Sequence, residues 1–292
     1  MLYIERKYML ATPVSVIIPA YNEEEGLGNV IERVKNTLGL VCPFEIIVVN
    51  DGSNDKTGEI ACSHSVSLIE NPANIGYGFS LKRGIRAATH ECVVITDADG
   101  TYPIEKLPEF IDKFNQGFDM VVGARQGSVY MSSVVKRFAR ACFKIMSEFV
   151  VGKRIPDINS GFRVLRKSKM LPILDDLSNT FSFTTSTTLI FFLRHYFIAY
   201  IPIEYHKRAG SSKVHYVRDA LIASQIMAEI ISRYNPIKMF LLLSLPAAIL
   251  MIIFLLLSIF GDSYNYSLAA LMSFYFWLLF MGMGFLGTLF RK

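Results

Sequence analysis

The chain has 292 residues, of which 52% are apolar and 19% are charged, and its formal net charge is +5. With a mean hydropathy of +0.36, it is too apolar for an ordinary soluble domain, and its modest charge leads us to expect no nucleic-acid partner. The cysteines lack metal-ligand spacing and are expected to be core thiols in a reducing compartment: Cys42, Cys62, Cys92 and Cys142.

The N-terminal third begins without the apolar core of a signal peptide, because residues 1–12 include Glu5, Arg6 and Lys7. The short apolar run 14–19 predicts a strand that ends at a proline. Residues 24–38 then predict an amphipathic helix, since their apolar side chains recur at helical spacing.

Strands and helices are expected to alternate through the next hundred residues. Apolar runs predict strands over 44–50, 66–69, 92–96 and 120–123. The segments between them predict helices over 57–63, 78–88 and 104–115. This alternation is typical of crossover units on a mainly parallel sheet, so the fold class is α/β.

Polar residues follow the predicted strands where each of them ends. In open α/β sheets that edge is where ligands bind. The residues concerned are Tyr21, Glu23, Asp51, Asp97, Asp99 and Arg125. Neither a GxGxxG motif nor a P-loop motif follows any of these predicted strands, which excludes a standard dinucleotide or P-loop site.

Asp97 and Asp99 stand one residue apart at the end of the strand 92–96. Two carboxylates there offer hard oxygen ligands to a divalent cation, which takes the rest of its shell from water and substrate phosphates. The alternative is an ordinary turn, because Asp and Gly favour turns.

Two basic amphipathic segments, 132–151 and 214–236, precede the apolar end of the chain. Such helices fit the plane of an anionic membrane surface. A core-facing helix with a solvated basic side is the alternative, equally favoured for the first segment. For the second segment, continuity with the apolar stretch that follows favours the membrane.

The C-terminal part, 237–292, predicts a transmembrane hairpin with spans 240–260 and 268–290, each long enough to cross a bilayer. Lys and Arg flank the hairpin but are absent from its loop, so we expect both chain ends and the catalytic part in the cytoplasm. Gly284 and Thr288 form a small-xxx-small pair that permits close helix packing, which leaves a homo-oligomer open.

An ordered set of motifs runs through the chain from Val14 to Pro236. The motifs are Val16-Ile17-Ile18-Pro19-Ala20-Tyr21-Asn22-Glu23, Val48-Val49-Asn50-Asp51-Gly52-Ser53, Asn74-Ile75-Gly76, Asp97-Ala98-Asp99-Gly100, Gly123-Ala124-Arg125, Ser160-Gly161-Phe162-Arg163 and Arg208-Ala209-Gly210-Ser211-Ser212-Lys213. In their order and spacing the chain resembles family 2 glycosyltransferases with the GT-A fold, in the branch that acts on polyprenyl phosphates and includes dolichyl-phosphate mannose synthases and undecaprenyl-phosphate sugar transferases.

The resemblance implies a GT-A domain over 1–213 and a role for each matching residue. Nucleotide contacts are implied for Pro19, Tyr21, Glu23, Asp51 and Asp97. Mg²⁺ or Mn²⁺ would bind Asp99, with Thr101 standing where mannose-type members commonly have Gln as a further ligand. Arg125 would lie near the donor sugar. Phosphate or acceptor contacts are implied for Arg137, Arg208 and Lys213, although Arg137 could equally be membrane-surface charge.

The resemblance therefore predicts inverting transfer of a sugar from a nucleotide sugar to dolichyl or undecaprenyl phosphate, with Asp99, Arg125 and Arg208 as catalytic residues. Thr101 favours a UDP-hexose or UDP-N-acetylhexosamine over GDP-mannose. The alternatives are a processive polysaccharide synthase or an inactive membrane scaffold. The single tryptophan, Trp277, lies in the second span, so the Gln-x-x-Arg-Trp segment of the processive synthases is absent.

Overall fold

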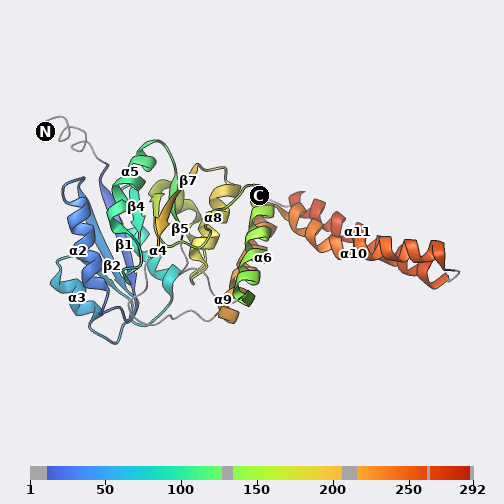
Figure 1. Cartoon of the computed structure of the whole chain (residues 1–292), viewed down its shortest axis with the longest axis horizontal. Helices are drawn as coiled ribbons and strands as arrows, with labels where there is room; N and C mark the ends of the chain where they lie inside the picture. The colour runs from blue at the N-terminus through green and yellow to red at the C-terminus, as the bar shows by residue number, and fades with distance from the viewer. Residues whose placement is uncertain (1–11, 127–133, 206–215, 262–263, 290–292) are drawn as a thin grey trace. The chain divides into compact units, whose positions relative to one another are not determined.

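The computed structural model describes residues 12–126, 134–205, 216–261 and 264–289. It divides into two compact units, Met1–Ala223 and Ser224–Lys292. The first unit is an α/β domain and the second is helical (Figure 1).

The α/β unit is built on a mixed seven-stranded sheet. Every described neighbour pair is parallel except those of β6, which runs antiparallel to β4 and β5. In spatial order the strands are β3 (Ser67–Glu70), β2 (Phe44–Asn50), β1 (Val14–Ala20), β4 (Cys92–Ile95), β6 (Arg163–Arg166), β5 (Met120–Gln126) and β7 (Ile198–Glu204). The predicted mainly parallel α/β fold is confirmed.

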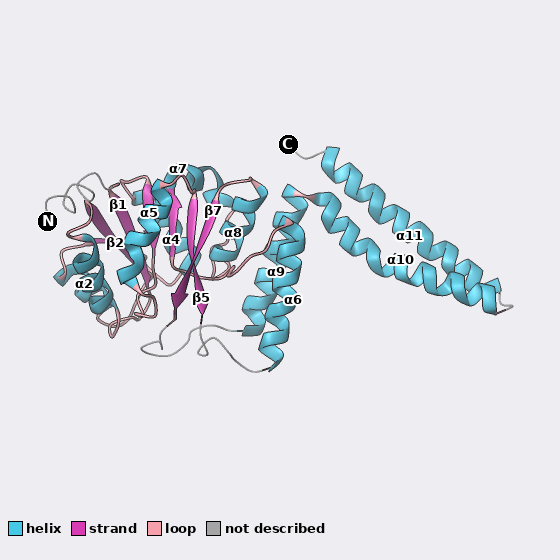
Figure 2. Cartoon of the chain, turned by 45° about the horizontal axis from the view of Figure 1, so that its top comes forward, coloured by secondary structure: helices cyan, strands magenta, loops and turns pink. Residues whose placement is uncertain are grey.

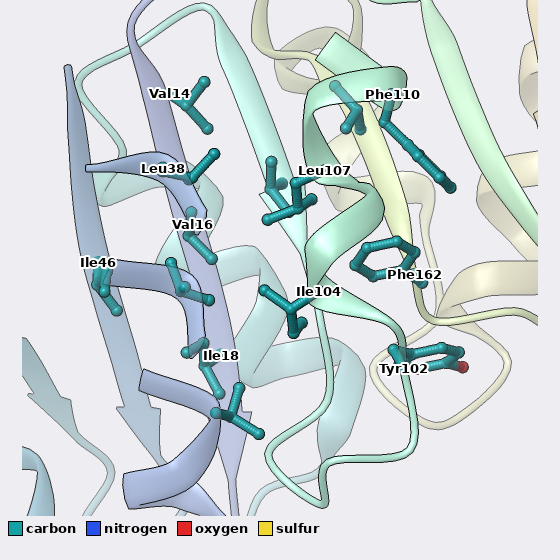
Figure 3. Close-up of a cluster of buried hydrophobic side chains, with 14 of the residues drawn as sticks. Val14, Val16, Ile18, Leu38, Ile46, Tyr102, Ile104, Leu107, Phe110 and Phe162 are labelled. Atoms are coloured by element: carbon teal, nitrogen blue, oxygen red, sulfur yellow. The ribbon is translucent and has the colours of Figure 1, made fainter. Parts of the chain in front are cut away.

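Apolar side chains bury both faces of the central strands because successive residues point to opposite sides. On one face, Val16 and Ile18 of β1 join Leu38 of α2 (Leu27–Leu38) and Phe110 of α5 (Leu107–Asn115) in one core cluster (Figure 3). On the other face, Gly84 of α4 (Tyr77–Ala87) packs so closely that a Cβ would collide with Ile17.

Among the elements without a counterpart in the sequence-based expectation are β6, β7 and α8 (Phe183–Leu193). α8 is buried along most of its length, so it lacks an amphipathic pattern. Two of its hydroxyl groups are satisfied within the helix, as Thr187 and Thr188 donate to the carbonyl oxygens of Phe183 and Thr184 at 2.8 and 2.9 Å, whereas Thr185 donates to Asn159 Oδ1 outside it. The remaining helices are α3 (Thr57–Ser63), η1 (Ile104–Lys106), α6 (Val134–Val151), α7 (Lys167–Met170) and η3 (Leu171–Asp176).

The helix predicted from residue 24 begins only at Leu27. The backbone N–H groups of Glu23 and Glu24 instead donate to Thr57 Oγ1 at 2.9 Å and Asp55 Oδ2 at 3.1 Å. These hydrogen bonds to a neighbouring loop compete with helix formation, and Glu23–Gly26 forms a turn.

The helical unit contains α10 (Pro236–Phe260) and α11 (Tyr264–Leu289), while α9 (Tyr216–Tyr234) lies across the boundary between the units. Both α10 and α11 are long and apolar enough to cross a membrane. In the most apolar 18-residue stretch of each helix, only 11% and 17% of the residues are buried. Within the hairpin, a Cβ on Gly284 would lie 3.0 Å from Phe240 Cβ, so this glycine lets the helices approach. Length, composition and exposure indicate a membrane protein.

Candidate active site

The polar strand ends meet at one edge of the sheet because β1, β2, β4 and β5 are aligned in the same direction. The reversed strand β6 begins at Arg163, which pairs with Ile95 at the end of β4 and with Val122 of β5. On the other side of β5 lies its parallel neighbour β7 (Figure 2). The segment before β6, residues 157–162, therefore reaches the same edge as Asp97, Asp99 and Arg125.

The loops after β1 and β2 are joined by hydrogen bonds. The N–H of Asn22 donates to Ser53 Oγ at 2.9 Å, and the N–H of Asn54 donates to Asn22 Oδ1 at 2.8 Å. Asn22 has a φ of 51°, a conformation that Asn tolerates better than most residues. This connection positions Tyr21 and Glu23, two of the residues for which nucleotide contacts are predicted.

Pro19 lies inside β1 and is buried. The pairing of β1 with β4 ends at Ile17, so Pro19 has a strand partner only on the β2 side, at Val49. Proline is tolerated there because one side of the strand needs no backbone donor.

Asp51 is buried and holds the loop that follows β3. Its Oδ1 accepts hydrogen bonds from Asn71 Nδ2 at 2.6 Å and from the N–H of Ile75 at 3.1 Å. Its Oδ2 accepts from the N–H of Gly76 at 2.9 Å. The carboxylate thus fixes the Asn74-Ile75-Gly76 motif beside the strand ends.

Asp97 faces the start of α4. Its Oδ1 accepts a hydrogen bond from the Tyr77 hydroxyl at 3.0 Å. A Cβ on Gly161 would lie 3.0 Å from both Asp97 Oδ1 and the Tyr77 hydroxyl, so only glycine fits there without displacing them. Burial, with the nearby charge of Asp97, raises the pKa of Tyr77 well above its usual value, so this hydroxyl stays a donor.

Asp99 is buried and oriented by Thr101. The N–H and the hydroxyl of Thr101 both donate to Asp99 Oδ1, at 3.1 and 2.7 Å. Tyr205 in turn hydrogen-bonds with Thr101, which opposes the burial that raises the pKa of Tyr205. In this geometry Thr101 supports the predicted metal-binding carboxylate of Asp99.

A divalent metal ion fits this site if Asp99 supplies one ligand and the substrate supplies others. Among the described residues, no three His, Cys, Asp or Glu side chains gather to hold a metal by themselves. An ion bound at Asp99 would need oxygen ligands from a diphosphate and water, which is the coordination that Mg²⁺ favours.

Arg125 forms a two-point ion pair with Asp157. Its Nε and Nη2 donate to Oδ2 and Oδ1 at 2.7 and 3.0 Å, and the two side chains are only 11% and 6% exposed. Burial acts to raise the pKa of Asp157, but the hydrogen bonds and charge of Arg125 outweigh it and lower that pKa. The Arg125 guanidinium also lies over the Tyr205 ring at 5.5 Å.

Four site residues were not predicted from the sequence: Tyr77, Asp157, Arg163 and Tyr205. Asp157 and Arg163 belong to the segment at the start of β6, an element that the strand pattern missed. Arg163 is fully buried and donates to the carbonyl oxygens of Ser160 and Ile158 at 2.6 and 2.8 Å. It holds the backbone between Asp157 and Gly161, and the Ser160-Gly161-Phe162-Arg163 motif was the available signal.

Three predicted phosphate-binding residues cannot be placed against this site. Arg208 and Lys213 lie outside the described residues. The backbone of Arg137 belongs to α6, but its side chain is outside the described part of the chain.

The sequence and fold of this chain are similar to those of known glycosyltransferases. Residues 15–171 match the family model "Glycosyl transferase family 2". The dolichyl-phosphate hexose transferase of Haloferax volcanii is 34% identical over 206 residues, which cover 69% of this chain and 86% of that protein. The undecaprenyl-phosphate 4-deoxy-4-formamido-L-arabinose transferase of Salmonella choleraesuis is 28% identical, over 70% of this chain and 63% of that protein.

Solved structures agree on the fold. Glucosyl-3-phosphoglycerate synthase from Mycobacterium tuberculosis, in complex with Mn²⁺, UDP-glucose and phosphoglyceric acid, superposes with a TM-score of 0.61 and 18% identity. The match covers 80% of this chain and 83% of that one. With the family match over more than half of the sequence, these findings show that the chain belongs to glycosyltransferase family 2.

Proposed function

We propose that this glycosyltransferase moves a sugar from a nucleoside-diphosphate sugar to a polyprenyl phosphate, with inversion at the anomeric carbon. The observation that carries this proposal is the joining of two features in one chain. The first is a family 2 domain with Asp97, Asp99 and Arg125 at its strand ends. The second is the pair of helices, later in the same chain, that are able to cross a membrane. The relatives named for dolichyl and undecaprenyl phosphates support such an acceptor.

The donor binds across the strand ends in this proposal. The joined loops carrying Tyr21, Glu23 and Asp51 hold the nucleoside, and Asp97 lies beside it. A bound Mg²⁺ or Mn²⁺ would neutralise charge that develops on the leaving diphosphate. Asp99 would hold that ion, and Thr101 keeps the carboxylate oriented.

The acceptor phosphate attacks the anomeric carbon while the bond to the diphosphate breaks. A phosphate monoester has a second pKa near 6 and is largely dianionic at neutral pH, so it needs no general base. The protein contributes positioning and charge stabilisation. Arg125 is held in one orientation by Asp157, which suits it to a fixed position beside the donor. Arg208 and Lys213, with Arg137, are proposed to meet the phosphates of donor and acceptor.

Membrane attachment would bring the lipid acceptor to this site. We propose that residues 237–292 form the membrane hairpin. We also propose that the segments 132–151 and 214–236 lie at the cytoplasmic surface of the membrane. In α6, Ile145, Met146 and Phe149 are exposed, as expected for a helix that meets lipid. Basic flanks and a loop without Lys or Arg support a cytoplasmic position for both chain ends.

The test is transfer activity of the full chain with radiolabelled nucleotide sugars and added dolichyl or undecaprenyl phosphate, with and without Mn²⁺. We expect Mn²⁺-dependent lipid-linked product, with a UDP-hexose or UDP-N-acetylhexosamine favoured over GDP-mannose. Asp99→Asn should lower the rate by about 100-fold or more while the protein stays folded. Metal-dependent nucleotide binding without transfer to any polyprenyl phosphate would show that the proposed acceptor is wrong. Absence of nucleotide binding would indicate an inactive scaffold.

A further inference from the structure

Arg33 of α2 contacts the loop that carries Asp99. Its Nη2 and Nη1 donate to the carbonyl oxygens of Tyr102 at 3.1 Å and Gly100 at 3.4 Å. These two carbonyls flank Thr101, whose N–H and hydroxyl orient Asp99. One guanidinium group therefore fixes the backbone on both sides of the residue that holds the metal-binding carboxylate.

A second acceptor sets the orientation of Arg33. Its Nε and Nη2 donate to the two carboxylate oxygens of Glu105, at 2.7 and 2.8 Å. This two-point pairing uses the planar fork of arginine, which lysine cannot reproduce. The hydrogen bonds that Arg33 donates to Glu105 raise the pKa of Arg33, so the guanidinium stays charged. Arg33 thus spans the loop from Gly100 to the first turn of η1.

The residue that precedes α2 also lies close to the loop that carries Asp99. Gly26, immediately before α2, lies so close to the loop that a Cβ would collide with the carbonyl oxygen of Ala98. Gly100 has a φ of 73°, a conformation that favours glycine and lets the chain turn after Asp99. The segment from Ala98 to Tyr102 is therefore contacted both by the residue before α2 and by Arg33 in the middle of that helix.

We propose that Arg33 is a positioning residue for the metal-binding carboxylate of Asp99, which makes α2 part of the machinery that sets metal affinity. The inference rests on the proposed metal role of Asp99. Arg33 acts through the backbone of Gly100–Tyr102 and Thr101. The pair itself adds little to global stability, because the side chains of Arg33 and Glu105 are 24% and 61% exposed.

The experiment measures Mn²⁺ binding to the full chain in detergent, saturated with UDP and, in parallel, with GDP. Arg33→Gln should weaken Mn²⁺ binding by about 10–100-fold, as for other outer-shell partners of metal ligands. Arg33→Lys should lie between Arg33→Gln and the wild type, because it keeps the charge but loses the fork. Nucleotide affinity without Mn²⁺ should stay unchanged, since the joined loops of Asn22 and Asn54 do not contact Arg33 in the hydrogen bonds described.

The matched control is Arg86→Gln. Arg86 also pairs with a carboxylate, Asp175, at 2.5 Å, but it belongs to α4, and its described hydrogen bond goes to Asp175 and not to the loop of Asp99. The Mn²⁺ affinity of Arg86→Gln should stay within about twofold of that of the wild type, because removing an ordinary exposed ion pair has little effect. Thermal midpoints of all variants show whether any change is merely loss of fold.

Two results would overturn the inference. The first is wild-type Mn²⁺ affinity in Arg33→Gln while Asp99→Asn weakens binding, which leaves the proposed function intact. The second is an equal loss of nucleotide affinity without metal, which would mean that Arg33 supports the whole site. If Asp99→Asn itself binds Mn²⁺ as tightly as the wild type, the proposed metal role is wrong, whatever Arg33 does.

Discussion

The α/β unit and the helical hairpin bury opposite kinds of residue. In the α/β unit the fully buried positions include Ile17, Leu107 and Phe110. In the hairpin, large apolar residues such as Leu256 and Phe276 are exposed, and the few buried positions are small or polar: Pro236, Ser244, Ala270, Ser273 and Gly284. The first pattern suits a domain in water, whereas the second suits helices in lipid, where packing depends on small residues.

The two regions also differ in their polar interactions. Buried charges of the α/β unit are neutralised or hydrogen-bonded, as Arg125 is by Asp157 and Arg163 is by backbone carbonyls. In the hairpin, the hydroxyl groups of Ser258, Ser273 and Thr288 donate to carbonyl oxygens of their own helices, at 2.8, 2.9 and 2.6 Å. Specific chemistry therefore belongs to the α/β unit, and the hairpin is suited to anchoring.

Leu107→Ala tests the difference in burial between the two regions and is expected to have the largest effect. The side chain is fully buried in the core cluster of β1, α2 and α5, so its truncation should cost about 3 kcal/mol in unfolding free energy. That loss corresponds to a fall of about 6–12 °C in the thermal midpoint of the α/β unit. The control is Leu256→Ala in α10, which should leave that midpoint unchanged. Equal losses from both variants would contradict the difference between the two regions, in which large apolar side chains are buried in the α/β unit and exposed in the hairpin.

A smaller effect is expected from Asp157→Asn, which removes the counter-charge of buried Arg125. The loss of charge-assisted hydrogen bonds should cost about 2 kcal/mol at neutral pH and reduce transfer. Because the folded pKa of Asp157 is lowered, the pair stabilises the protein above the unfolded pKa of about 3.9 and is lost as pH falls through the folded pKa. The deficit of the variant should therefore shrink below about pH 4.

Chemical denaturation at several pH values measures this effect. The control is Asp175→Asn, because Asp175 is exposed and pairs with Arg86 on the surface. A deficit that persists unchanged into acid would show that the charge of Asp157 is not its source.

The smallest effect is expected from Gly284→Leu. A side chain there must displace Phe240 in α10, at a cost of about 1 kcal/mol in hairpin packing. Trp277 is the single tryptophan of the chain and lies in α11, so its fluorescence during SDS denaturation reports on the hairpin. Gly282→Leu is the control, because a Cβ on Gly282 meets no atom within 4 Å. Indistinguishable SDS midpoints for the two variants would remove the proposed packing role of Gly284.

Local patterns in the sequence determined much of this protein. Alternating apolar runs predicted the first five strands and their helices, and α3 was predicted with the observed bounds, since periodicity and turn residues act over short distances. The absence of charge over two long apolar segments predicted the hairpin. Asp97, Asp99 and Arg125 stood out because parallel strands bring their ends to one edge.

The partners of those residues were decided only in three dimensions. Antiparallel β6 inserts between β4 and β5, and this reversal brings Asp157 to Arg125 and Gly161 to Asp97, across 32 and 64 positions of the chain. Arg33 reaches Gly100 and Tyr102 from a helix 67 and 69 positions away. Such contacts depend on strand order and helix packing, which no local pattern encodes. The sequence therefore determined which residues could do the chemistry, and the tertiary structure decided what holds them in place.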